Sequence, residues 1–211
     1  VTNTPYPMDP QKTGEAYDKI AEWWQEQHVN SSYGLPALKR ALEFSTTRGK
    51  ALDVGCGSSG RFLRKFDDFG YVPVGVDISA KMIESAKRLD PEFEFHCANI
   101  VDWEIPTKFD LITAWDSTFH LPLECQEMVL EKMCRALTDN GVILFTCGGT
   151  WEPEEISGNF QGQTFEYSTL GISSYLSQLE KHGVLLRHLE YDQWPENHVF
   201  IIGQKASPKI V

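Results

Sequence analysis

Apolar and polar residues follow two different periods along this chain, one typical of helices and one typical of buried strands. Apolar residues spaced three or four apart predict amphipathic helices, and this spacing occurs in 13–28, 35–44, 58–66, 79–89, 122–137 and 173–183. Short segments rich in apolar residues predict strands, and they occupy 50–55, 71–77, 92–97, 109–115, 141–146, 184–192 and 198–205. Strands and helices alternate through the first five strands, which predicts a doubly wound parallel α/β sheet with helices on both faces.

The last third of the chain departs from this alternation. The strands 184–192 and 198–205 are separated by a connection too short for a crossover helix, so we expect them to be antiparallel neighbours. The segment 148–171 is rich in glycine and acidic residues, which favours an ordered loop or lid. We therefore predict one domain over 1–211, with an N-terminal helical cap at about 10–45.

Composition and charge exclude several classes of protein. A chain of 211 residues with 41% hydrophobic residues can build one substantial core. Its net charge of −11 disfavours nucleic acid as a partner. No stretch has the length of a membrane span, and the first ten residues do not read as a signal peptide, so we expect a cytoplasmic protein. Five scattered cysteines without a Cys/His cluster predict no metal site, and monomer and homodimer both stay open.

A glycine-rich stretch after the first strand carries the main functional signal. Residues 55–60, Gly-Cys-Gly-Ser-Ser-Gly, fit the pattern G-x-G-x-x-G between a strand and a helix. Such a turn leaves room for a ligand beside the free N–H groups of the helix start. Asp77 ends the next strand, 20 positions after Gly57, where a carboxylate can accept both hydroxyls of a ribose. The sequence therefore predicts a nucleoside-containing ligand at this edge of the sheet.

Four segments in this order, ALDVGCGSSGRFL, VGVDIS, FDLITAWDSTFHLP and LTDNGVILFT, resemble the motifs of class I S-adenosylmethionine-dependent methyltransferases. The resemblance covers about residues 15 to 205, and small bacterial enzymes acting on small molecules are the most similar members. It implies S-adenosyl-L-methionine as cofactor and a Rossmann-like, seven-stranded sheet whose last strand lies beside the fifth. It also implies cofactor contacts from Tyr17, Asp53, Gly55, Cys56, Gly57, Asp77, Ile78, Asn99 and Ile100. Asn99 departs from the aspartate that many members have, and Ser59 from a third glycine.

The end of the fourth predicted strand brings three further candidates to the ligand edge of the sheet. Trp115 either packs against the cofactor and attracts its positive sulfur, or is an ordinary core aromatic. Asp116 is a catalytic base, a substrate clamp or a helix cap. His120 titrates near neutral pH and is either a catalytic group or a structural hydrogen-bonding residue.

Two candidates lie later in the chain. Tyr167, in the acidic segment, and His198, at the start of the last strand, are expected to line the pocket of the methyl acceptor, with simple packing as the alternative. Tyr17 and Trp24 on the first helix either close over the cofactor or cover the sheet edge.

Methyl transfer to a small soluble molecule is the leading functional hypothesis. It needs mainly alignment of donor and acceptor, with a base where the acceptor carries a proton. An NAD-dependent oxidoreductase shares the glycine pattern and the downstream acid. A non-catalytic S-adenosylmethionine-binding protein is the third reading.

Overall fold

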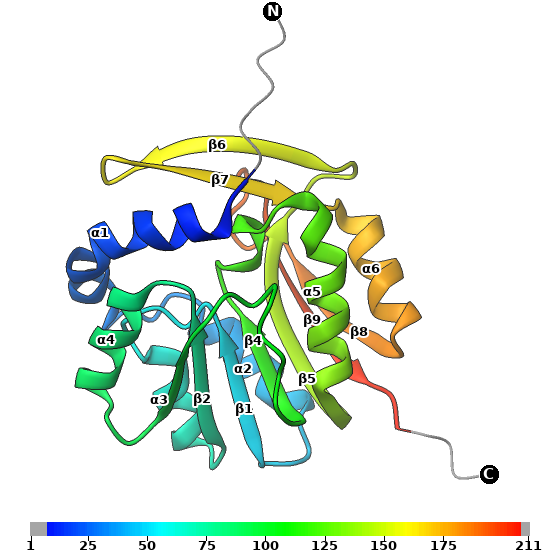
Figure 1. Ribbon diagram of the computed structural model, residues 1–211. Helices are drawn as coiled ribbons and strands as arrows, with labels where there is room; N and C mark the ends of the chain where they lie inside the picture. Colours follow the sequence, from blue (N-terminus) through cyan, green and yellow to red (C-terminus); the bar gives the residue numbers. More distant parts are fainter. Residues whose placement is uncertain (1–7, 208–211) are drawn as a thin grey trace, which may run out of the picture.

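A seven-stranded sheet forms the centre of the molecule (Figure 1), in a computed structural model that describes residues 8–207. The first and last residues of the predicted 1–211 domain lie outside this range. In spatial order the strands are β3 (Glu94–Cys97), β2 (Val72–Asp77), β1 (Lys50–Val54), β4 (Phe109–Ala114), β5 (Leu137–Gly148), β9 (His198–Lys205) and β8 (Val184–Glu190). The first five are parallel, whereas β9 is antiparallel to both of its neighbours. The predicted doubly wound fold with a terminal antiparallel hairpin is confirmed.

Helices cover both faces of this sheet. The α-helices are α1 (Pro10–His28), α2 (Leu35–Phe44), α3 (Arg61–Asp68), α4 (Ala80–Leu89), α5 (Leu123–Ala136) and α6 (Ile172–Lys181), and a short 3-10 helix, η1, spans Thr118–His120. One apolar cluster joins α5 and α6 to the sheet, and another joins α2, α3 and α4 to it. Neighbouring strand residues such as Ala51 and Leu52 belong to opposite clusters, as the alternation of side chains along a strand requires.

A serine and a glycine precede two of the helices. Ser79 caps α4, since its hydroxyl accepts a hydrogen bond from Met82 N at 3.1 Å. The serines of the glycine-rich stretch do not cap α3. Gly60 occupies the N-cap position there with φ +62°, a left-handed conformation that glycine adopts without steric cost. Gly60 therefore ends the loop, one position after the place where the commoner pattern has its third glycine.

The fifth strand is longer than the predicted 141–146. Strand β5 begins at Leu137, and its pairing with β4 shifts register, because Phe109 pairs with Leu137 whereas Leu111 pairs with Val142. Asn140, within this bulge, has φ +62°. The turn residues thus bend the strand without interrupting it.

The segment 148–171, expected to form an ordered loop or lid, contains a β-hairpin that the sequence analysis did not predict. Strands β6 (Glu154–Phe160) and β7 (Gln163–Thr169) pair along their full length. The hairpin crosses above α1 at the carboxyl edge of the parallel strands (Figure 1). Six of the seven residues of β6 are exposed, so the strand has no core-facing apolar row for a sequence pattern to reveal.

Within residues 8–207, none of the helices combines the length and the apolar character needed to cross a membrane. The same part of the chain holds no group of three or more His, Cys, Asp or Glu side chains placed to bind a metal ion.

Candidate functional site

A cleft opens at the carboxyl edge of the parallel strands, beneath α1. It encloses about 1010 Å³ of space, counting its open mouth. Twelve of the residues singled out from the sequence line it: Tyr17, Asp53, Gly55, Cys56, Gly57, Asp77, Ile78, Asn99, Ile100, Trp115, Asp116 and His120. Tyr167 and His198 lie elsewhere.

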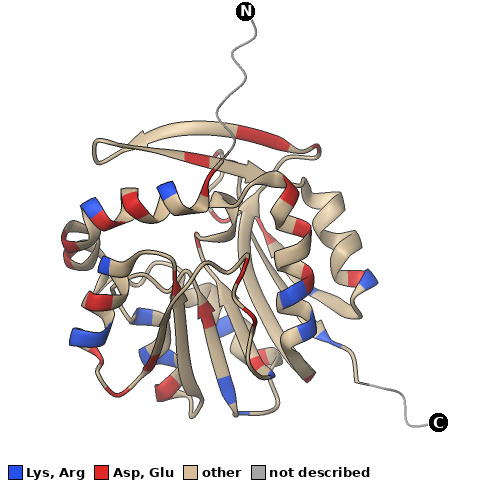
Figure 2. Cartoon of the chain, viewed as in Figure 1, with Lys and Arg blue, Asp and Glu red and all other residues tan. Residues whose placement is uncertain are grey.

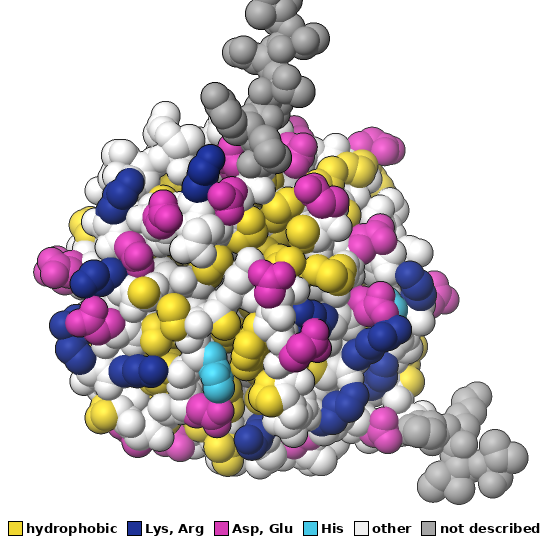
Figure 3. Space-filling view, in the orientation of Figure 1, with side chains coloured by type: hydrophobic (Ala, Val, Ile, Leu, Met, Phe, Trp, Pro, Cys, Tyr) yellow, Lys and Arg dark blue, Asp and Glu magenta, His cyan; other side chains and the backbone are white. Residues whose placement is uncertain are grey.

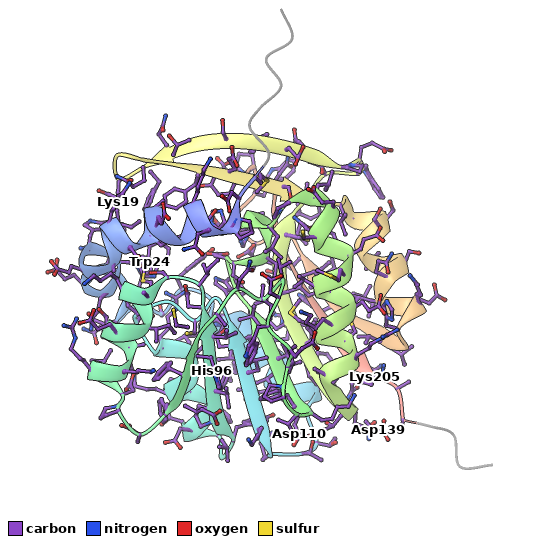
Figure 4. The ribbon with its side chains drawn as sticks, in the orientation of Figure 1. Lys19, Trp24, His96, Asp110, Asp139 and Lys205 are labelled. Carbon is purple, nitrogen blue, oxygen red and sulfur yellow. The ribbon has the colours of Figure 1, made fainter. Side chains whose placement is uncertain are left out.

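The glycine-rich loop forms one wall of the cleft. At Gly55, with φ +72°, a Cβ atom would lie 2.2 Å from the Cβ of Ser117, so only glycine fits. Gly57, with φ +60°, faces the indole of Trp24, whose Nε1 would be 3.3 Å from an added Cβ. Trp24 extends from α1 toward this loop (Figure 4). The loop therefore approaches both η1 and α1 as closely as backbone can.

Asp77 joins the glycine-rich loop to the start of α4. Its carboxylate accepts hydrogen bonds from Gly57 N at 2.9 Å and from Ser79 N at 2.8 Å. Burial raises the pKa of this carboxyl group, and the two backbone N–H groups oppose that rise. The acid is thus fixed by backbone donors at the position predicted for binding a ribose.

A buried acid and a buried base lie deeper in the cleft. Asp53, in β1, accepts a 2.6 Å hydrogen bond from the hydroxyl of Thr113, and burial raises its pKa to about 7. Arg61, the first residue of α3, has no hydrogen-bond partner for Nε among the described residues. Burial lowers the pKa of Arg61, while Asp53 and Asp116 favour its charged form. An unpartnered, buried guanidinium N–H fits the carboxylate of a ligand.

The sequence analysis did not single out Arg61. In the helix pattern Arg-Phe-Leu-Arg-Lys-Phe, an arginine at this position resembles a solvent-facing charge. Its place directly after the G-x-G-x-x-G pattern was the available signal, because the first helical residue points toward a ligand bound at the helix N-terminus.

The far end of the cleft is mostly apolar. Ile78, Ile100 and Met82 line it, and Gly14 of α1 comes so close to Ile78 that an added Cβ would lie 3.2 Å from Cγ2. Asn99 Oδ1 accepts a hydrogen bond from Val101 N at 3.0 Å, which fixes the amide at the rim. This end offers a flat apolar slot with one polar edge.

Trp115 closes the opposite end of the cleft. Its side chain is 6% exposed and packs against the rings of Phe62 and Phe200, with centroids 6.0 Å away in both cases. The indole Nε1 is buried and lacks a hydrogen-bond partner within residues 8–207. Trp115 is therefore a core aromatic that also lines the cleft, so the two readings of this residue are not exclusive.

His120 is buried between α1 and the hairpin. Its Nδ1 lies 2.9 Å from the carbonyl oxygen of Glu166, and its Nε2 lies 2.9 Å from the hydroxyl of Tyr17. A carbonyl only accepts, so Nδ1 carries the proton and Nε2 accepts from Tyr17. Burial lowers the pKa of His120 to about 4 and raises that of Tyr17. A neutral histidine thus joins α1, η1 and β7.

Tyr167 and His198 line a second cavity next to the cleft, between the hairpin, the end of β5 and the β8–β9 connection. The ring of Tyr167 lies 4.8 Å from that of His120, which lines the first cleft. The second cavity therefore meets the cleft along a wall that contains His120.

Asp116 belongs to the same wall. It has φ +49°, which is strained for a residue other than glycine. Its Oδ1 lies 2.9 Å from His198 Nε2, and His198 Nδ1 lies 2.6 Å from Asp192 Oδ1. Ser117, and not Asp116, occupies the N-cap position of η1. The cap reading of Asp116 is therefore wrong.

Comparison with known proteins identifies the domain. Residues 51–141 match the family model described as "Methyltransferase domain". The match covers a little under half of the chain. The chain is 26% identical over 148 residues to a dTDP-3-amino-3,6-dideoxy-alpha-D-glucopyranose N,N-dimethyltransferase of Streptomyces fradiae, covering 69% of this chain and 56% of that one. It is 28% identical over 149 residues to the phosphoethanolamine N-methyltransferase of Plasmodium falciparum, covering 68% and 56%.

Solved structures agree with this assignment of the fold. Magnesium protoporphyrin IX methyltransferase from Synechocystis, with bound S-adenosylmethionine, superimposes with a TM-score of 0.71 at 13% identity, over 97% of this chain and all of that one. The Rossmann-like methyltransferase fold, predicted from the sequence motifs, is confirmed. The chain spans just over half the length of the curated relatives it matches.

Proposed function

We propose that this protein transfers a methyl group from S-adenosylmethionine to a small-molecule acceptor. The observation that carries the proposal is one continuous cleft with an acid at the ribose position, a glycine wall and an arginine whose buried Nε has no hydrogen-bond partner among the described residues. This combination matches a ligand that has a ribose at its centre and a carboxylate at one end. The methyltransferase domain and the relatives found for the chain support the same reaction.

Each part of the cleft would hold one part of this cofactor. Asp77 binds the ribose hydroxyls, and Asn99 contacts the adenine between Ile78 and Ile100. The methionine portion lies along Gly55, Cys56 and Gly57, with Arg61 at its carboxylate and Asp53 near its amino group. Trp115 packs beside its sulfur. These assignments, Arg61 excepted, agree with those implied by the sequence motifs.

The cofactor, when bound, supplies an electrophilic methyl group on a sulfonium. The protein's main task is then to align the acceptor and exclude water, which alone contributes roughly 7 to 11 kcal/mol of barrier reduction. Tyr17 and His120 close the cleft from above, and Phe165 of the hairpin packs on Tyr17 with ring centroids 4.7 Å apart. We propose that α1 and the hairpin form the lid that keeps solvent out.

The acceptor atom is proposed to be a nitrogen that enters through the second cavity. Both curated relatives are named for methyl transfer to nitrogen, one on an amino sugar nucleotide and one on phosphoethanolamine. Asp116 supplies a carboxylate beside such a nitrogen, and Tyr167 lines the acceptor's path. No Lys or Arg occurs in the hairpin segment 154–169, which carries three glutamates (Figure 2), and this charge favours a cationic acceptor.

We propose that this reaction takes place in the cytoplasm, in one domain that does not act on nucleic acid. The five cysteines are all free, as reducing conditions would keep them. The net charge of −11 disfavours a phosphate backbone as ligand.

An NAD-dependent oxidoreductase is the less favoured alternative. The sheet continues after β5 with the antiparallel strands β9 and β8, where a dinucleotide-binding domain would build a second mononucleotide half. A non-catalytic S-adenosylmethionine-binding protein shares the cleft, and only turnover separates it from the enzyme.

Two measurements test the proposed function. Calorimetry with S-adenosylhomocysteine and, separately, with NADH identifies the cofactor, and we expect binding of the first alone. Mass spectrometry then follows methyl transfer to a panel of amines, alcohols and carboxylic acids that includes phosphoethanolamine. An increase in the mass of an amine by that of one CH2 group for each methyl group transferred supports the proposal. Absence of S-adenosylhomocysteine binding contradicts it.

A further inference from the structure

Asp116 is fixed from more sides than a loop residue ordinarily is. Its backbone N–H donates to Thr146 Oγ1 of β5 at 2.8 Å, and its Oδ1 faces His198 Nε2 at 2.9 Å. The charge of Asp116 also contributes to the raised pKa of the Tyr33 hydroxyl, after burial. These contacts hold the residue at φ +49°, so the surrounding structure compensates for a strained backbone that aims one side chain.

His198 lies between two carboxylates. Asp116 Oδ1 is 2.9 Å from Nε2, and Asp192 Oδ1 is 2.6 Å from Nδ1. Ionised carboxylates only accept hydrogen bonds, so both ring nitrogens must donate, and an imidazolium is the form that can do so. With both nitrogens engaged, the ring of His198 has no nitrogen left for a substrate. His198 therefore lines the second cavity without a free ring nitrogen for a hydrogen bond to an acceptor.

The β8–β9 connection, residues 191–197, carries Asp192 and is itself anchored near the cleft. Gln193 Nε2 donates to the hydroxyl of Tyr33 at 2.6 Å. Tyr191 donates to the carbonyl of Gly149 at 2.9 Å, at the end of β5. The connection thus reaches Asp116 along two routes, through His198 and through Tyr33.

We propose that Asp192 and His198 form a positioning pair that orients the Asp116 carboxylate at the boundary between the cleft and the second cavity. This inference rests on the proposed function, and it specifies the acceptor as a molecule that binds with an ammonium group at Asp116. The ammonium proton would pass to the Asp116 carboxylate, which frees the nitrogen lone pair to take the methyl group. The Asp116–His198–Asp192 row keeps a net charge of about −1 when the imidazolium is present. Asp192 lines neither the cleft nor the second cavity, so it acts on the acceptor only through His198 and Asp116.

Several other titratable groups feel the charges of this row. Asp116 and Asp192 are the two that face His198 closely enough to raise its pKa, although burial, the largest single effect, acts to lower it. The groups that feel the charge of Asp116 are Tyr17, His28, Tyr33, Arg61 and His120. Of these groups only Arg61 is a permanent cation. Two positive charges therefore lie near Asp116, that of Arg61 on the cofactor side and that of the His198 imidazolium on the acceptor side.

Nuclear magnetic resonance titration of the His198 ring tests the pair without any acceptor. The ring signals of His198 in the full chain are followed from pH 5 to 9. S-adenosylhomocysteine is added to saturation if it binds, and the protein is titrated alone if it does not. We expect a midpoint above 6.5 with both ring nitrogens protonated at neutral pH. In Asp192→Asn, the midpoint falls by about one pH unit. Glu196→Gln removes a charge from the same connection without removing a contact of His198, and it leaves the midpoint in place.

A wild-type midpoint at or below 6.5, or equal midpoints in Asp192→Asn and the wild type, overturns the inference. The wild-type result stands alone if the variant does not fold. With any amine that the panel shows to be methylated, Asp192→Asn is expected to raise KM about tenfold while the affinity for S-adenosylhomocysteine stays unchanged, because a charge-assisted hydrogen bond is lost behind the acceptor site only. Loss of cofactor binding in the wild type contradicts the proposed function, whereas it leaves the titration result readable.

Discussion

Acidification should weaken this fold through His120 in particular. The residue is 7% exposed, its Nδ1 donates to Glu166 O, and its Nε2 accepts from Tyr17, so the folded state has no room for a second ring proton. Burial lowers its pKa to about 4 from 6.5. Protonation would place a donor on Nε2 facing the hydroxyl of Tyr17 and an unpaired charge in a buried site.

The sign and size of the effect follow from the two pKa values. Because the folded state binds the proton less readily than the unfolded chain, stability is complete above pH 6.5 and is lost as the pH falls toward 4. Between pH 7 and pH 5, this one residue should remove about 2 kcal/mol from the free energy of unfolding. That loss is a large fraction of the marginal stability of a typical domain.

Urea unfolding at pH 7, 6 and 5, followed by tryptophan fluorescence, measures this contribution. His120→Gln cannot titrate, so the free-energy difference between wild type and variant should shrink by about 2 kcal/mol from pH 7 to pH 5. The other histidines contribute equally to both proteins and cancel. Tyr17→Phe, which removes only the donor to Nε2, should cost about 1 to 2 kcal/mol at pH 7. A pH-independent difference between wild type and His120→Gln would refute the buried, neutral assignment.

Three further predictions concern the cleft. Asp77→Asn keeps the shape of the side chain but loses its charge, so calorimetry should show S-adenosylhomocysteine binding weakened about tenfold or more with an unchanged circular dichroism spectrum. Burial raises the pKa of Asp53 to about 7, and we expect its ionised form to bind the amino group of the cofactor. The affinity for S-adenosylhomocysteine should therefore rise about tenfold between pH 6 and pH 8 in the wild type and should not change with pH in Asp53→Asn. Gly70→Ala, with φ +83° and open space around it, should cost about 1 to 2 kcal/mol in thermal unfolding. Gly55→Ala should lower the free energy of unfolding by clearly more, because its Cβ would also collide with Ser117. Equal losses in the two variants would contradict the close contact between the glycine-rich loop and Ser117.

Much of the fold was predictable because burial leaves a periodic record in the sequence. Strands covered on both faces, such as 109–115, are nearly all apolar, and the connection after 184–192 is too short for a crossover. The hairpin was missed for the opposite reason. Strand β6 is exposed along most of its length, and its neighbours in the hairpin are joined through backbone hydrogen bonds that no side-chain pattern reports.

The site was predictable where chemistry follows the chain and unpredictable where it depends on contacts across the fold. Asp77 and the glycine-rich loop lie at fixed spacing from the first strand, so their meeting could be inferred. Asp116, His198 and Asp192 come together only because β9 inserts beside β5, which brings residues 82 positions apart into a 2.9 Å hydrogen bond. No local pattern marks Asp192. On the face shown in Figure 3, hydrophobic side chains gather in the middle and charged side chains surround them.

Titration calorimetry of the wild-type protein with S-adenosylhomocysteine tests the central claim most directly. We expect one molecule to bind per chain with a micromolar or lower dissociation constant. S-adenosylmethionine should compete for the same site, and NADH should give no binding heat. The absence of binding heat with S-adenosylhomocysteine across a concentration range up to millimolar, from a protein that is folded by circular dichroism, would contradict it.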